Sequence, residues 1–199
     1  MIRFVASVTL FVSMSAVSPP AHPFSPLSDH QAPAKRPDAP QLAPYVPTPQ
    51  DVVDRMLALA GVKKGELVVD LGCGDGRIPI TAAKKYGARG FGVDIDPQRI
   101  AEANANAKAA RVEHLVTFAL QDAMKTDVSK ANVVTTYLLS ASNLKLRPIL
   151  TRQLAPGARI ITHSFSMGDW TPAKVDTFAD LEGRGRTLYL YIADGKVRQ

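Results

Sequence analysis

The stretch VVDLGCGDGRIPI, residues 68–80, decides the fold. It opens with a short, almost continuous apolar run, which is typical of a strand buried on both faces of a parallel sheet. Three glycines follow at alternate positions, Gly72, Gly74 and Gly76, and a helical pattern begins after them. A strand, a glycine turn and a helix in this order predict the ligand-binding corner of a doubly wound α/β fold.

The spacing of the glycines narrows the choice of ligand. A dinucleotide site has G-x-G-x-x-G and a P-loop has G-x-x-x-x-G-K-[ST], whereas this loop reads G-x-G-x-G. Asp70 and Asp75 flank and interrupt the glycines, and carboxylates repel phosphate. S-adenosylmethionine carries a sulfonium, an ammonium and a carboxylate but no phosphate. The loop therefore favours this ligand, with Asp70 facing its amino group; the alternative is a tight turn that binds nothing.

Two further acidic residues follow later strands. Asp94 lies near the end of the expected strand 88–96, where a carboxylate can accept hydrogen bonds from both hydroxyls of a ribose. Asp122 follows the segment 115–120 and is placed to meet an adenine amino group, with the small Ala123 against the ring. Because the carboxyl ends of parallel strands share one edge, Asp70, Asp94 and Asp122 are expected to converge on one crevice.

The rest of the chain alternates in the same way. Strands are expected at 66–72, 88–96, 115–120, 131–139 and 158–165, with helices between them and a final hairpin over 174–193. This alternation predicts an α/β fold with a doubly wound, mostly parallel sheet and antiparallel strands at one edge. A first helix begins at Thr48, a good N-cap before Pro49.

These motifs resemble those of class I S-adenosylmethionine-dependent methyltransferases. DLGCGDGRI, GVDID and QDA are similar to the family's first three motifs, and the likeness covers about residues 45–195. The resemblance implies a seven-stranded sheet in the order 3-2-1-4-5-7-6, with strand 7 antiparallel. It also implies that Asp70 and the three loop glycines border the methionine part of the cofactor, Asp94 the ribose and Asp122 the adenine.

A narrower resemblance points to an acceptor. YVPTPQDVVDRMLALA, running into the glycine loop with its DGRI, is similar to a bacterial group related to the lysine methyltransferases of the mitochondrial ATP synthase c-subunit. This resemblance implies N-methylation of a protein lysine. A small-molecule methyltransferase, a binding module without catalysis and, further off, a nicotinamide oxidoreductase are the alternatives.

The segment after the fourth expected strand bears on the acceptor. Amino-group methylases of nucleic acid bases carry [DNS]-P-P-[YFW] at this point, whereas this chain has TTYLLS, so a nucleic acid acceptor is not expected. Tyr137 is expected beside the methyl donor, or else in the core. Tyr45 and Thr48 are candidates for a lid over the cofactor, or else simple capping residues.

The segment THSFSMGDW, residues 162–170, is the second candidate for the acceptor side. His163, Phe165, Asp169 and Trp170 would form an aromatic and acidic rim that suits a lysine side chain through cation–π contact and charge. His163 is also a candidate base for the ammonium proton. The alternatives are a strand-end histidine and packing or turn residues.

The front of the chain is expected to lie outside the domain. Residues 1–18 hold one positive charge and an apolar run, which predicts a signal peptide or a membrane anchor. Residues 19–47 are rich in proline and predict an extended linker, so the domain is placed at 48–199. The protein is therefore expected to be exported or membrane-anchored, or cytoplasmic if the true start lies downstream.

The bulk composition excludes several classes of site. Cys73 is the only cysteine of the 199 residues, so no intramolecular disulfide can form and no metal site is expected. The formal net charge of +6 is spread without a block of like charges, which indicates a solvated surface rather than a polyanion-binding tract.

Overall fold

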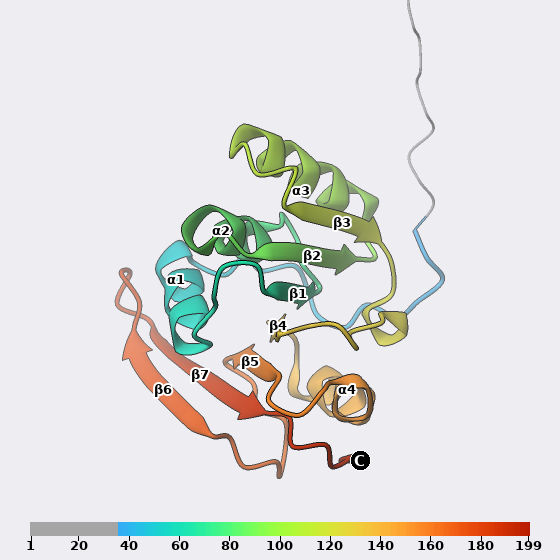
Figure 1. The fold of residues 1–199 in the computed structure, drawn as a ribbon, viewed down its shortest axis with the longest axis vertical. Helices are drawn as coiled ribbons and strands as arrows, with labels where there is room; N and C mark the ends of the chain where they lie inside the picture. Colours follow the sequence, from blue (N-terminus) through green and yellow to red (C-terminus); the bar gives the residue numbers. More distant parts are fainter. Residues whose placement is uncertain (1–35) are drawn as a thin grey trace, which may run out of the picture. The chain divides into compact units, whose positions relative to one another are not determined.

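The computed structural model describes residues 36–199, so the expected leader 1–18 and most of the proline-rich segment lie outside the described residues. Figure 1 shows a sheet with helices on both sides. The helices are α1 (Gln50–Leu59), α2 (Arg77–Tyr86), α3 (Pro97–Ala109), the short 3₁₀ turn η1 (Ala123–Lys125) and α4 (Ser140–Gln153). The strands are β1 (Leu67–Leu71), β2 (Arg89–Asp94), β3 (Val116–Leu120), β4 (Val133–Thr136), β5 (Arg159–His163), β6 (Lys174–Ala179) and β7 (Gly185–Ile192).

The seven strands form one sheet in the order β3-β2-β1-β4-β5-β7-β6. The pairs among β1 to β5 are parallel, whereas β7 runs antiparallel to both β5 and β6. This confirms the expected strand order and the terminal hairpin. The order reverses between β1 and β4, and doubly wound sheets bind their ligands beside the carboxyl ends of the strands at such a switch point.

Alternate residues of the central strands enter different hydrophobic clusters. Val68 of β1 packs with Val52 and Met56 of α1, whereas its neighbour Val69 packs with Leu146 of α4. Successive strand side chains point to opposite faces, so α1 and α2 cover one face of the sheet and α4 covers the other (Figure 1). Both faces of the central strands are therefore buried, as the continuous apolar runs predict.

The start of the first helix differs from expectation. Pro49 is the N-cap residue of α1 with extended φ and ψ, and the side chain of Thr48 makes no capping hydrogen bond. The capping role expected of Thr48 is therefore wrong. Thr48 is 4% exposed, and its carbonyl oxygen accepts a hydrogen bond from Arg77 Nη1 at 2.7 Å.

The segment 36–48, called the strap below, also differs from expectation. The sequence predicts that it belongs to a spacer, but it forms part of the same compact unit as the sheet. Leu42 and Ala43 pack on the cluster beneath α4, and Ser142 Oγ donates to the carbonyl oxygen of Leu42 at 2.5 Å. The packed part of the chain thus begins before Thr48. Within residues 36–199, no helix has the length and apolar character that crossing a membrane requires.

Candidate active site

One cleft lies at the carboxyl ends of β1, β2 and β4, beside the switch point of the sheet. The glycine loop after β1 and the strap both line it. Nine of the sequence-predicted site residues line this cleft: Tyr45, Thr48, Asp70, Gly72, Gly74, Asp94, Asp122, Ala123 and Tyr137. The fold therefore brings together residues that are up to 92 positions apart in the chain.

The glycine loop has a backbone conformation that is unfavourable for residues other than glycine. Gly72, Gly74 and Gly76 all have positive φ, at 83°, 51° and 77°. A side chain at Gly74 would meet the Tyr45 ring at 2.5 Å, and one at Gly76 would meet the Phe118 ring at 2.6 Å. Gly76 accordingly supports the loop from behind, against β3 and α3, rather than lining the cleft.

Asp70, near the end of β1, is the most deeply buried carboxylate that lines the cleft. It is 3% exposed, and its Oδ1 accepts a hydrogen bond from Thr135 Oγ1 of β4 at 2.6 Å. Burial raises the pKa of Asp70 to about 7, the Thr135 hydroxyl opposes this, and the charges of Asp94 and Asp75 add to it. A cation in the cleft would lower that pKa, because it stabilises the ionised form.

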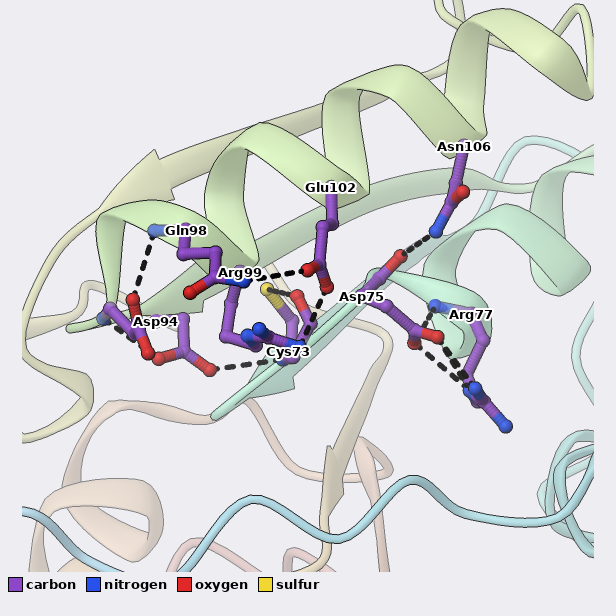
Figure 2. Close-up of polar contacts among 10 residues, drawn as sticks. Cys73, Asp75, Arg77, Asp94, Gln98, Arg99, Glu102 and Asn106 are labelled. Atoms are coloured by element: carbon purple, nitrogen blue, oxygen red, sulfur yellow. Dashed lines mark hydrogen bonds and ion pairs between the residues drawn. The ribbon is translucent and has the colours of Figure 1, made fainter. Parts of the chain in front are cut away.

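Asp94, at the end of β2, ties the second strand to the loop. Its Oδ2 accepts from the Gly74 N–H and its Oδ1 from the Asp96 N–H, both at 3.0 Å (Figure 2). Asp96 caps α3 by accepting from the Gln98 N–H at 2.9 Å. Asp94 is left partly exposed on the cleft, where its lone pairs are open to a ligand hydroxyl.

Asp122 and Ala123 close the far end of the cleft after β3. Asp122 is 8% exposed, and its Oδ1 accepts from the Met124 N–H at 2.9 Å, which caps the turn η1. Ala123 is 6% exposed and belongs to the core cluster beneath α4. The pair therefore offers an acidic edge and a small apolar surface, which suits a flat heteroaromatic ring.

Two arginines of the site were missed by the sequence interpretation. Arg77 Nε and Nη2 donate to the Asp75 carboxylate at 2.9 and 2.5 Å (Figure 2), while Nη1 holds the strap at Thr48. Burial acts to raise the pKa of Asp75, but the hydrogen bonds and charge of Arg77 outweigh it and lower that pKa. The D-G-R sequence at residues 75–77 could have indicated this ion pair, because a carboxylate and a guanidinium two residues apart can pair at the start of a helix.

The second of these arginines, Arg99, fixes the strap from the other side. Its guanidinium lies 4.4 Å from the centre of the Tyr45 ring, over its face, and pairs with Glu102 at 2.7 Å. Tyr45 is 44% exposed and lies between this cation and Gly74. The lid expected of Tyr45 and Thr48 thus has a physical basis in three contacts that span the strap and the Rossmann-like domain.

Tyr137 follows β4 and lines the cleft beside Asp70 and Leu138. Tyr137 is partly exposed, which favours the expected place at the cleft over a fully buried core position. Leu138 is 5% exposed and lies against Gly72, where an added side chain would meet it at 3.2 Å. The end of β4 therefore contributes an aromatic residue to the lining of the cleft.

The expected rim in THSFSMGDW does not form. Trp170 is 7% exposed, with its ring centre 4.9 Å from that of Tyr191 and with Arg198 stacked on it, away from the cleft. Asp169 pairs with Arg147 on α4 instead of facing an acceptor. The assignment of Trp170 to the acceptor site is therefore wrong, because its indole serves packing against the C-terminal strand and tail.

His163 also lies outside the cleft. It is fully buried behind Tyr137, with ring centres 3.9 Å apart. Burial lowers its pKa to about 4, so the ring is neutral near pH 7. A base for an acceptor ammonium must lie within hydrogen-bond reach of it, and the position of His163 does not provide this. The catalytic role expected of His163 is not supported.

The arrangement fits S-adenosylmethionine on grounds of shape and charge. The floor is a left-handed glycine turn that a Cβ would obstruct, so a ligand can approach the backbone closely. The carboxylates of Asp70, Asp94 and Asp122 all line the cleft, and carboxylates accept hydrogen bonds from ammonium, hydroxyl and amino groups. The three carboxylates do not suit a phosphate, because like charges repel.

Comparison with known proteins decides the family. The model of the ANTKMT methyltransferase domain matches residues 70–174, which is more than half of the chain. The chain belongs to this methyltransferase family. The match starts at Asp70 and spans the cleft from the glycine loop to the start of β6.

Two curated relatives give the range of the family. The protein-lysine N-methyltransferase of Saccharolobus islandicus is 43% identical over 150 residues, covering 75% of this chain and 92% of that protein. The lysine N-methyltransferase of the ATP synthase c-subunit from Homo sapiens is 31% identical over 132 residues, covering 66% of this chain and 56% of the human protein.

Solved structures agree on fold and cofactor. A structure described as an RNA methyltransferase from Salinibacter ruber, in complex with S-adenosyl-L-homocysteine, is 48% identical with a TM-score of 0.72, covering 77% of this chain and 97% of that chain. A Geobacter sulfurreducens SAM-dependent methyltransferase with the same ligand is 26% identical with a TM-score of 0.53, covering 63% and 51%. This chain of the ANTKMT family is an S-adenosylmethionine-dependent methyltransferase with a Rossmann-like fold.

Proposed function

We propose that this methyltransferase N-methylates lysine side chains of a protein. The observation that carries the proposal is the extent of the likeness to the Saccharolobus enzyme, which covers 92% of a protein named for lysine methylation. The human relative, named for a lysine of the ATP synthase c-subunit, supports the same acceptor chemistry.

The charge of the cleft is consistent with this acceptor. Five aspartates line it, at 70, 75, 94, 96 and 122, against three arginines, at 36, 77 and 99. Two of these arginines are engaged within the protein, Arg77 by Asp75 and Arg99 by Glu102 and the Tyr45 ring. The excess of carboxylates attracts both a cationic cofactor and a lysine side chain.

The residues of the cleft are assigned roles on this basis. Asp70 accepts from the amino group of the cofactor, Asp94 from its ribose hydroxyls, and Asp122 from its adenine. The loop of Gly72 and Gly74 permits close approach of the methionine part, and Gly76 keeps the loop packed. The strap residues Tyr45 and Thr48 cover the bound cofactor and exclude water.

The chemistry demands little of the protein beyond alignment. When bound, S-adenosylmethionine supplies an activated methyl carbon, to which the neutral amine of the acceptor forms a C–N bond as the C–S bond breaks. Tyr137 offers its ring face to the developing ammonium, because a cation is stabilised by a nearby aromatic face. The acceptor ammonium gives its proton to water before the transfer, because no imidazole among the described residues lines the cleft. The methylated product is itself an ammonium and keeps its proton near pH 7.

A transfer assay tests the acceptor class. The purified full chain is incubated with S-adenosylmethionine labelled in its methyl group and with a cell extract, and the label is then divided among protein, RNA and solvent-extractable molecules. We expect the label in protein, released by protease and not by nuclease. Label released by nuclease would match the acceptor named for the Salinibacter structure, and label in the solvent extract would point to a small molecule; either would overturn the proposal.

A variant pair tests the place of the acceptor end. Tyr137→Ala is expected to lower methyl transfer by at least tenfold while S-adenosylhomocysteine still binds. Tyr86→Ala is the matched control, because Tyr86 ends α2 and does not line the cleft. Unchanged turnover of the Tyr137 variant would show that the acceptor enters elsewhere.

We also propose that residues 1–18 export the protein or anchor it to a membrane, and that residues 19–35 connect this segment to the strap. The apolar run after Arg3 supports the proposal. Fractionation of cells that express the chain with a C-terminal tag tests it. Recovery of the full-length protein in the cytoplasmic fraction alone would contradict it.

A further inference from the structure

The chain turns sharply at the end of β5, directly behind Tyr137. Thr162 Oγ1 donates to the carbonyl oxygen of Phe165 at 2.6 Å, and Nδ2 of Asn143, on α4, donates to the same oxygen at 2.9 Å. Ser164 has a φ of 64°, in the left-handed region that non-glycine residues rarely adopt. Contacts from two elements hold this strained turn, so the residue within it has little freedom to move.

His163 is the residue that the turn holds in place. Its side chain is fully buried, and its ring centre lies 3.9 Å from that of Tyr137, with the planes 30° apart. Within residues 36–199, neither ring nitrogen has a hydrogen-bond partner. Buried polar atoms without partners are destabilising, so the imidazole is not at this position for the sake of its hydrogen bonds.

Burial, assisted by a nearby cation, keeps the His163 ring neutral. Burial lowers its pKa, and the Arg186 guanidinium of β7 lowers it further, while Asp180 opposes both. The Asp180 carboxylate is already engaged, because it pairs with Arg186 at 2.7 Å and accepts from the Glu182 and Arg184 N–H groups at 3.0 and 2.8 Å. A neutral ring can stack against a tyrosine without placing a second cation behind the transfer site.

We propose that His163 is a positioning residue that holds the Tyr137 ring at the angle required at the transfer end of the cleft. The buried imidazole contacts the Tyr137 ring, and Tyr137 lines the cleft whereas His163 does not. This inference rests on the place of Tyr137 in the proposed function, but it does not depend on the identity of the acceptor.

Two other roles make different predictions. A general base would need the imidazole nitrogens, so His163→Phe would lose activity and the pH profile would change. If His163 only fills space, its substitution would change the melting temperature but not ligand binding at the cleft. A positioning residue acts through Tyr137, so its effect must vanish when Tyr137 is absent.

The test uses two cofactor analogues that need no acceptor. S-adenosylhomocysteine lacks the methyl group, whereas sinefungin carries an ammonium at the place of the methyl-bearing sulfonium. The ratio of their affinities, measured by calorimetry on the full chain, therefore reports on the ring that faces the transferred group. We expect Tyr137→Ala to reduce the preference for sinefungin by about fivefold, the value of one cation–π contact.

The variants of His163 then decide the inference. We expect His163→Ala to reduce the sinefungin preference by about threefold or more in the wild-type background and not at all in the Tyr137→Ala background, whereas His163→Phe restores it. His114→Ala is the control, because His114 is exposed and lies in the loop before β3.

Each outcome is informative. A change with Tyr137→Ala but none with His163→Ala would leave His163 a packing residue and overturn the inference. Equal effects of His163→Ala in both backgrounds, or a loss with His163→Phe, would also overturn it. If Tyr137→Ala itself leaves the ratio unchanged, the assignment of Tyr137 fails first, and the role of His163 fails with it.

Discussion

The buried carboxylate of Asp70 predicts that cofactor binding releases a proton. In the free protein its pKa is raised to about 7. The cofactor's ammonium, facing this carboxylate, requires the ionised form. The apparent dissociation constant therefore exceeds that of the fully ionised protein by the ratio of total Asp70 to ionised Asp70. That factor is about 11 at pH 6, about 2 at pH 7 and about 1.1 at pH 8. Affinity for S-adenosylhomocysteine is thus expected to rise about tenfold from pH 6 to pH 8.

The same shift has a consequence for stability. A carboxyl whose pKa is higher in the folded state than in the unfolded chain holds its proton more tightly when folded. The contribution of Asp70 to the free energy of unfolding therefore falls as the pH rises from about 4 to about 7. Bound S-adenosylhomocysteine should remove much of this loss, because it favours the ionised form. Melting curves with and without the ligand measure the difference.

Calorimetry in buffers of different ionisation enthalpy measures the proton release. Thr135→Val removes the hydroxyl that lowers the pKa of Asp70, so its affinity profile should move to higher pH. Asp127→Asn, in an exposed loop, is the matched control and should leave the profile unchanged. A wild-type affinity that is constant from pH 6 to pH 8, with no proton released, would refute the reasoning.

Three further predictions concern the loop, the second carboxylate and the acid range. Gly74→Ala should weaken S-adenosylhomocysteine binding at least tenfold, because the added side chain would meet the Tyr45 ring at 2.5 Å. Calorimetry measures the affinity, with Gly183→Ala, at an open turn, as the control. A Gly74→Ala variant with wild-type affinity would contradict the prediction. Asp94→Ala should cost about 2 kcal/mol or more of binding free energy, the value of a charge-assisted hydrogen bond, whereas an effect below twofold would exclude contact with the ribose. The contribution of His163 to the free energy of unfolding should fall by about 2 kcal/mol between pH 7 and pH 5, opposite in sign to that of Asp70, because the pKa of His163 is about 4 when folded. Urea titrations at each pH measure this contribution as the difference in the free energy of unfolding between wild type and His163→Phe. A difference that does not vary with pH would contradict the prediction.

The parts of the site that sequence reasoning found share one property. The glycine loop, Asp94 and Asp122 sit at strand ends, where the chain's own alternation fixes which edge they share. Their position follows from local pattern and parallel topology, so no knowledge of side-chain packing was needed. The strand order follows from the same alternation, together with the family resemblance.

The parts that sequence reasoning missed depend on contacts between distant segments. The strap has the composition of a linker. Its place on the domain comes from Leu42, which packs against the core, and from Arg77 and Arg99, which no local pattern links to it. Trp170 looks like a site residue because it follows β5, yet the strand β7 and Arg198 enclose it. Turns after β5 are set by tertiary packing, which explains why the acceptor side was the weaker part of the prediction.

The measurement that tests the central claim most directly is peptide mass spectrometry after transfer from methyl-deuterated S-adenosylmethionine. The full-length protein is incubated with a cell extract, and the Asp94→Ala variant serves as the inactive control. The proposed function predicts deuterated methyl groups on lysine side chains of one or a few proteins, absent with the variant. Deuterated methyl groups found only on RNA, only on small molecules or on no molecule at all would contradict it.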